Sequence, residues 1–222
     1  MRWRLRHRWA RTAPSSGSPG RGRTKVRRQA PAKAGTERRP RRHDPDRKTR
    51  ILDAALDVLV EHGMAGATHR HIAAHADVPL GSVTYHFANL ADLQVQAFAR
   101  YVGQQTVVFE SVFDDVETHE QFVEILVDFV HGGPARHRSA VLGFEFHLAA
   151  LRNPELRALM HVWTKSSQEV LARYVGADNA VRLDALLEGM IMHALLAIEP
   201  EPRAVTRAAI ARTVDPSGWP GA

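Results

Sequence analysis

The chain has 222 residues, no cysteine and a formal net charge of +6. The lack of Cys excludes a disulfide framework, a zinc knuckle and a Cys nucleophile, and no run reaches the roughly 18 apolar residues that a membrane-spanning helix requires. The first residues are no secretory signal, because Trp3, Leu5 and Trp9 stand isolated among arginines. We therefore expect a soluble, cytoplasmic protein with no membrane partner.

The positive charge is concentrated at the start of the chain. Residues 1–50 carry +15, whereas residues 51–222 carry −9. Residues 1–43 are rich in Arg, Pro, Gly and Ser and have too few apolar side chains to offset the entropy lost on folding. We predict a disordered basic arm over 1–43 and a short disordered tail over 215–222.

Helical periodicity begins after the arm. Asp44-Pro45 predicts a helix start, and Gly63 predicts the end of that helix. Thr68 is expected to cap a short helix that runs through Ala76. Residues 77–79 predict a turn, and residues 80–87 a second short helix.

The rest of the chain also predicts helices. Asn89 opens a long helix, Thr118 with Gln121 forms a capping-box pattern, and Asp178 is expected to cap a helix that ends near Glu199. No period-two alternation indicates strands. We predict an all-α fold of about nine helices, the later ones covering 89 onward, 118–132, 134–152, 153–176, 178–199 and 202–213.

The two short helices with their tight turn form a helix-turn-helix pattern. Ile72 and Ala73 on the first helix are placed to face Val83 on the second, and small Ala76 with Val78 allows a close bend. The first residues of the second helix in such a motif reach base edges in the major groove of DNA.

Residues 47 to about 101 resemble the DNA-binding domain of the TetR family of bacterial transcriptional regulators. The matching segments are Arg50-Ile51-Leu52-Asp53-Ala54-Ala55, His62-Gly63, Ile72-Ala73-Ala74, Val78-Pro79-Leu80-Gly81-Ser82 and Tyr85-His86-Phe87, followed by Leu90 and Leu93. The resemblance implies a three-helix helix-turn-helix DNA-binding domain over 44–100. It also implies a C-terminal helical bundle over 101–214 for ligand binding and dimerisation.

The resemblance assigns DNA contacts by position. Thr68, Arg70, Tyr85 and His86 match phosphate contacts, the base-facing positions are Leu80, Gly81, Ser82 and Thr84, and Arg47 joins them from the basic segment. Many members have Lys where Leu80 stands and another near 89–92, where this chain has none. Since residues 51–100 hold only two cations, Arg70 and Arg100, against five acids, their own attraction to DNA should be weak.

The basic arm and the histidines leave alternatives open. Arg38, Arg39, Arg41, Arg42, Arg47, Lys48 and Arg50 are the arm residues best placed to touch DNA. The distal arm could also be an unselected tail or the product of a misassigned start codon. His71 and His75, four residues apart with His69 nearby, could bind a metal, but we expect them to be polar surface positions. Together with His86, these three histidines could add to DNA affinity at low pH.

The C-terminal domain is apolar enough for a core and a cavity. The candidate cavity walls are Phe98, Tyr101, Phe122, Phe129, Phe144, His147, Leu151 and Trp163. The candidate dimer contacts, on the apolar helix 178–199, are Leu183, Leu186, Leu187, Met190, Ile191, Ala194 and Ile198. Each of these residues could instead belong to the plain core.

The sequence therefore predicts a homodimeric regulator that reads a pseudo-palindromic operator in double-stranded DNA. Repression relieved by a small-molecule effector is the mode that the resemblance implies, and activation remains an alternative. No catalytic constellation, cofactor or metal site is indicated, so we do not expect an enzyme. The other readings are a small-molecule-binding or enzymatic helical protein that kept the motif incidentally, and an architectural DNA binder dominated by its arm.

Overall fold

The computed structural model describes residues 44–214, and within this range all regular structure is helical. This confirms the predicted all-α fold. The helices are α1 (Arg47–Gly66), α2 (His69–His75), α3 (Leu80–His86), α4 (Leu90–Ser111), α5 (His119–His131), α6 (Pro134–Ala150), α7 (Pro154–Val175), α8 (Ala177–Leu196) and α9 (Arg203–Thr213). None of them is long and apolar enough to cross a membrane, as judged over the described residues.

Three of the predicted helix caps are confirmed. Thr68 Oγ1 accepts the backbone N–H of His71 at 3.3 Å, and Asn89 Oδ1 accepts that of Asp92 at 2.9 Å. Thr118 forms the expected reciprocal capping box with Gln121 at the start of α5. These side chains satisfy N–H groups that the first turn of a helix leaves without a backbone partner.

Two predicted starts are wrong. Helix α1 begins at Arg47 rather than at Asp44-Pro45, because the Asp44 carboxylate pairs with Arg50 at 3.0 Å instead of capping. Helix α8 begins one residue before Asp178, because Gly176 has a φ of 76° and turns the chain directly from α7 into α8. Asp178 then lies in the first turn of α8, where its charge favours the helix dipole.

Gly63 interrupts α1, as the sequence predicts. Its φ of 62° and ψ of −177° are not helical, although one further turn follows to Gly66. A residue with a Cβ rarely adopts this backbone conformation. The break lets the chain turn from α1 toward α2.

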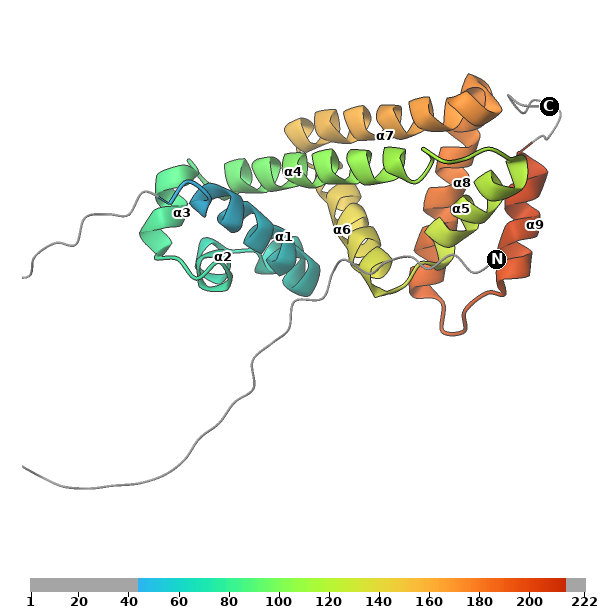
Figure 1. Ribbon diagram of the computed structural model, residues 1–222. Coiled ribbons are helices and arrows are strands. Elements are labelled where there is room, and N and C mark those ends of the chain that lie inside the picture. Colours follow the sequence, from blue (N-terminus) through green and yellow to red (C-terminus); the bar gives the residue numbers. More distant parts are fainter. Residues whose placement is uncertain (1–43, 215–222) are drawn as a thin grey trace, which may run out of the picture. The chain divides into compact units, whose positions relative to one another are not determined.

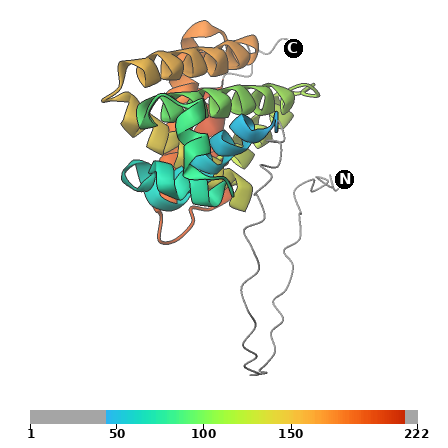
Figure 2. The same ribbon diagram turned by 90° about the vertical axis from the view of Figure 1, so that its left-hand side faces the viewer.

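Two apolar clusters form the core. The first joins α1–α3 to α4, α6 and the start of α7, with Ile51, Ile72 and Phe98 fully buried. The second lies among α5, α7, α8 and α9 around Phe122 and Leu183. Figure 1 shows α4 and α7 side by side, running from the end that carries α1–α3 toward α5, α8 and α9. Figure 2 looks onto the end that carries α1–α3.

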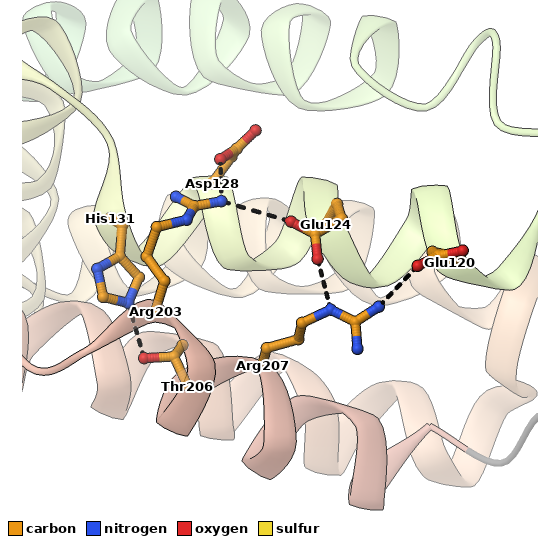
Figure 3. A network of polar contacts seen from close by, with 7 residues as sticks. All are labelled: Glu120, Glu124, Asp128, His131, Arg203, Thr206 and Arg207. Atoms are coloured by element: carbon orange, nitrogen blue, oxygen red, sulfur yellow. Dashed lines mark hydrogen bonds and ion pairs between the residues drawn. The ribbon is translucent and has the colours of Figure 1, made fainter. Parts of the chain in front are cut away.

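Helix α9 is tied to α5 by a row of ion pairs (Figure 3). Arg207 donates to Glu124 at 2.5 Å and to Glu120 at 3.1 Å, and Arg203 reaches Asp128 at 2.7 Å. The three acids recur every fourth residue, so they share one face of α5. The row fixes the last helix against the second apolar cluster.

Candidate nucleic-acid interface and internal cavity

Helices α2 and α3 form a tight helix-turn-helix. Ile72 on α2 and Val83 on α3 are fully buried against the first cluster. The turn is closed by the Val78 N–H, which donates to the Ala73 carbonyl at 3.0 Å. Asp77 has a φ of 51°, a left-handed conformation that Asp tolerates in turns. The predicted core of the motif is therefore confirmed.

The predicted DNA contacts lie mainly on the exposed side of this motif. Tyr85 is 83% exposed and Leu80 is 45% exposed, whereas Phe87 is buried. Large apolar side chains left in water on a small element point to a partner that covers them. Of the other candidates, Thr68, Arg70, Gly81 and Thr84 are exposed and Arg47, Ser82 and His86 are half-buried. Their contacts with DNA stay predictions.

The cationic side chains near the motif differ in whether an acidic side chain pairs with them. Arg100 is held by both Asp53 oxygens at 2.6 and 3.1 Å, and Arg50 by Asp44. Arg70 is exposed and takes part in no ion pair with another described residue. Lys48 lies over the Phe87 ring at 5.7 Å. The arm residues Arg38 to Arg42 fall outside the described range.

Two of the three histidines of α2 have intramolecular partners, whereas the buried Nε2 of His69 has no hydrogen-bond partner among the described residues. His71 Nδ1 lies 2.9 Å from the Gly66 carbonyl oxygen, and His75 Nε2 lies 3.4 Å from Asp57 Oδ2. Within residues 44–214, no three His, Cys, Asp or Glu side chains come together in a way that could hold a metal ion. Their proposed effect on DNA affinity at low pH remains a prediction.

A cavity of about 110 Å³ lies among α4, α6, α7 and α8. Five of the eight candidate wall residues line it, namely Tyr101, Phe129, Phe144, His147 and Trp163. Tyr101 and Trp163 meet edge to face, with ring centroids 5.5 Å apart. Gly143 makes this possible, since a Cβ there would lie 3.3 Å from the Tyr101 hydroxyl and 3.5 Å from the Trp163 ring. Burial raises the pKa of Tyr101 to about 12, so its hydroxyl stays protonated and donates to the Ser139 carbonyl at 2.9 Å.

The other three candidates lie elsewhere. Phe98 is fully buried in the first apolar cluster and stacks on Phe146 at 4.7 Å. Phe122 is fully buried in the second cluster. Leu151 ends α6 and is 69% exposed. Helix packing places these side chains away from the cavity. The spacing of apolar residues in the sequence does not distinguish them from the residues that do line the cavity.

Polar side chains that the sequence reading did not select complete the cavity. Asp184 accepts the Ser167 hydroxyl at 2.6 Å and the Gln168 amide at 3.2 Å, and Glu188 Oε1 lies 3.3 Å from His147 Nε2. The bond to Glu188 raises the pKa of His147, and burial raises that of Asp184. Both acids stand four residues apart within the apolar stripe of α8, a signal that the sequence carried and that could have identified them.

An open groove of about 740 Å³ adjoins the cavity, and Phe129, Arg136, Ala140 and Ile191 line both. The Arg136 guanidinium lies 4.5 Å from the Phe129 ring centroid, and Arg136 Nε donates to the Phe129 carbonyl at 3.0 Å. Burial lowers the pKa of Arg136. Arg136 pairs with no carboxylate of the described residues. A cation without an acidic partner and an aromatic ring therefore lie where the cavity and the groove adjoin.

The candidate dimer residues divide between the interior and the surface. Leu183 and Leu187 are buried in the second cluster, and Met190 and Ile191 pack against it. Leu186 is half-buried and lines the open groove together with exposed Ala194. Ile198 is 100% exposed. The exposed members are those available to a second subunit.

Helix α6 joins the cavity to the helix-turn-helix. Its Arg138 forms an ion pair with Asp57 of α1, which also pairs with His75 of α2. Its Glu145 accepts the Met64 N–H at 3.3 Å, beside the break in α1. One face of α6 therefore forms a cavity wall while other side chains of α6 hold α1 and α2.

Comparison with known proteins agrees with both halves of this description. The model for bacterial regulatory proteins of the tetR family matches residues 51–96, and that for the tetracyclin repressor-like C-terminal domain matches residues 117–216. Transcriptional regulator SCO7518 from Streptomyces coelicolor A3(2) is 39% identical, with a TM-score of 0.69 over 77% of this chain and 99% of that chain. The multidrug binding protein EbrR complexed with ethidium is 35% identical, with a TM-score of 0.64 over 78% of this chain and 100% of that chain.

Among curated relatives, the HTH-type transcriptional regulator PksA of Bacillus subtilis (strain 168) is 28% identical over 164 residues, which cover 68% of this chain and 79% of PksA. The matched ranges contain the helix-turn-helix and the cavity helices α6, α7 and α8. The chain belongs to the TetR family and is a transcriptional regulator with a DNA-binding helix-turn-helix domain and a tetracyclin repressor-like C-terminal domain.

Proposed function

We propose that this regulator is a repressor that leaves its operator when a small molecule enters the internal cavity. The observation that carries the proposal is the double role of α6, which supplies Gly143, Phe144 and His147 to the cavity and Arg138 and Glu145 to the contacts with α1 and α2. A ligand that displaces α6 must disturb those contacts.

The mechanism is a shift between two states. The ligand binds best where α6 has moved to enlarge the cavity, and DNA binds best where α6 holds α1 and α2 as described here. The ligand can shift the equilibrium only by its difference in affinity for the two states. A coupling of about 1–3 kcal/mol is typical and corresponds to a 5- to 150-fold loss of DNA affinity.

A similar protein supports a small-molecule effector. EbrR has been crystallised with ethidium, with malachite green and with proflavin. The cavity residues of this chain lie within the range that matches the family's C-terminal domain, apart from those on α4. EbrR has also been crystallised with imidazole, and its 33–35% identity to this chain supports a small-molecule effector here without favouring one size.

We propose further that the protein acts as a homodimer through α8 and α9. Both helices carry apolar side chains in water, namely Leu196 on α8 at 75% exposure and half-exposed Val205 on α9, and fully exposed Ile198 lies in the segment that joins them. Burying these on a second copy removes apolar surface from water. A two-fold dimer also supplies two recognition helices for a pseudo-palindromic operator.

The DNA part of the proposal is tested by gel shift against the region upstream of the gene, at two salt concentrations. A repressor discriminates its operator from random DNA by a factor of about 10³ or more, and a compound that enters the cavity releases it. Binding without sequence preference would instead indicate an architectural role for the arm. If compounds bind the cavity but none of them releases the protein from its operator, the ligand-release mechanism is wrong.

The coupling through α6 is tested by Asp57→Asn. This variant removes the carboxylate charge that pairs α1 with both α6 and α2, so we expect it to bind operator but to need a changed ligand concentration for release. The control is Asp53→Asn, which weakens the Arg100 pair between α1 and α4, away from α6. Equal release curves for the wild type and Asp57→Asn would contradict this route.

The dimer is tested by the molar mass in solution, measured by light scattering after size-exclusion chromatography. Leu196→Asp places a charge on the proposed interface and should shift the protein toward the monomer. Leu151→Asp, a matched change at an exposed Leu after α6, should leave the mass unchanged. A monomeric wild type would refute the proposal.

A further inference from the structure

Going one step beyond the proposed ligand response, and resting on it, we propose that the cavity selects aromatic organic cations. Asp184 would hold the positive charge, and the rings of Tyr101 and Trp163 would hold the aromatic body. The inference follows from the charges on the α8 side of the cavity, from the geometry of its rings and from the groove that adjoins it.

The α8 side of the cavity has one negative charge in excess. His147 Nδ1 lies 2.8 Å from the Gly143 carbonyl oxygen and Nε2 lies 3.3 Å from Glu188 Oε1. Since both neighbours are acceptors, the ring is bonded best as an imidazolium, which neutralises Glu188. Asp184 receives only the neutral donors Ser167 and Gln168 and pairs with no Lys or Arg of the described residues. A half-buried carboxylate without a counter-ion is costly, and a bound cation would remove that cost.

The rings around these acids suit a flat cation. The Trp163 ring lies 5.5 Å from the Tyr101 ring at an interplanar angle of 77° and 6.2 Å from the His147 ring. Phe144 closes the wall, with its ring 5.8 Å from that of His147. Aromatic faces attract a cation placed against them, and this attraction adds to that of a carboxylate within the same apolar site.

The cavity must open to receive such a molecule. Its 110 Å³ falls below the 300–1,000 Å³ usual for sites of drug-sized ligands. The wall toward the open groove contains Arg136 and Phe129, and Arg136 is held by one hydrogen bond and a ring contact rather than by an acid. Movement of this pair would join the two spaces. An incoming cation would then repel Arg136 toward the groove and take its place beside the Phe129 ring.

The alternative to a cationic ligand is an anionic one, because the Arg136 guanidinium could attract an anion. Three compounds with one ring system separate these cases, namely 9-aminoacridine (a cation), acridine at pH 8 (neutral) and acridine-9-carboxylate (an anion). Binding to the purified full-length protein is measured by fluorescence titration without DNA. We expect 9-aminoacridine to bind at least about tenfold more tightly than acridine, and the carboxylate more weakly than either.

Two variants locate the effect. Asp184→Asn should weaken 9-aminoacridine binding about tenfold while it leaves acridine binding within about twofold. Glu188→Gln should weaken binding of the cation less than Asp184→Asn does, because His147 already neutralises Glu188. The control is Glu169→Gln, an exposed acid of α7 outside the cavity lining, which should leave the affinities for all three compounds unchanged. Thermal unfolding of each variant without ligand shows whether the fold is retained.

Three results would overturn the inference. These are equal affinity for the cation and the neutral compound, tighter binding of the carboxylate, and no binding of any acridine. A cation preference that survives Asp184→Asn would also overturn the assignment of the charge to Asp184. Because binding is measured without DNA, these results leave the proposed repressor function standing, and failure of DNA release would leave the cation selectivity standing.

Discussion

Replacing Gly63 by Ala tests the join between the helix-turn-helix and α6. Gly63 has a φ of 62° and a ψ of −177°, a region that costs a residue with a Cβ about 1–3 kcal/mol. The new Cβ would also lie 3.3 Å from Glu145 Oε1, which is tighter than ordinary contact. Displacing Glu145 would weaken its bond with the Met64 N–H, a further loss of about 1 kcal/mol. We therefore expect the free energy of unfolding to fall by about 2–4 kcal/mol.

The assay is urea unfolding followed by circular dichroism, with all variants at one protein concentration because dimerisation couples to stability. A loss of this size moves the midpoint down by about 1 M or more. The matched control is Gly103→Ala, on an exposed face of α4 where a Cβ meets nothing within 4 Å. It should stabilise the protein by up to about 1 kcal/mol, because Ala favours a helix over Gly. An unchanged or higher midpoint for Gly63→Ala would refute the reasoning.

Three further substitutions separate the core, the cavity and the DNA surface. Phe98→Ala should lower the free energy of unfolding by about 3–5 kcal/mol in urea titrations, because Phe98 is fully buried and stacked on Phe146; a loss below about 1 kcal/mol would contradict its place in the core. The raised pKa of His147, due first to Glu188, stabilises the fold below the pKa of an unfolded His, and this contribution is lost as the pH rises through the folded value. Urea midpoints at several pH values should therefore fall less steeply from acid to alkaline pH in His147→Gln than in the wild type, and parallel curves would rule this out. Tyr85→Ala should change stability by less than about 0.5 kcal/mol, because Tyr85 is 83% exposed, yet weaken operator binding in gel shifts; unchanged affinity would remove Tyr85 from the DNA contacts.

Local signals in the sequence predicted most of the helical framework. Thr68, Asn89 and Thr118 cap helices through bonds that span three residues, so their roles can be predicted from spacing alone. The break of α1 at Gly63 was also predictable locally, because only Gly adopts that backbone conformation readily. The helix-turn-helix was recognisable because its buried, turning and exposed positions all lie within twenty consecutive residues.

The tertiary structure determined which residues meet in the cavity. Phe98 and Tyr101 lie one turn apart on α4, yet Phe98 stacks in the core and Tyr101 lines the cavity. Asp184 meets Ser167 only because α7 and α8 pack side by side. These pairings join segments far apart in the chain. Helical periodicity predicts which face of its own helix a residue occupies, but it does not predict which other helix packs against that face. The sequence by itself therefore determined the fold class and the helix-turn-helix, whereas packing among α4, α6, α7 and α8 determined the chemistry of the cavity.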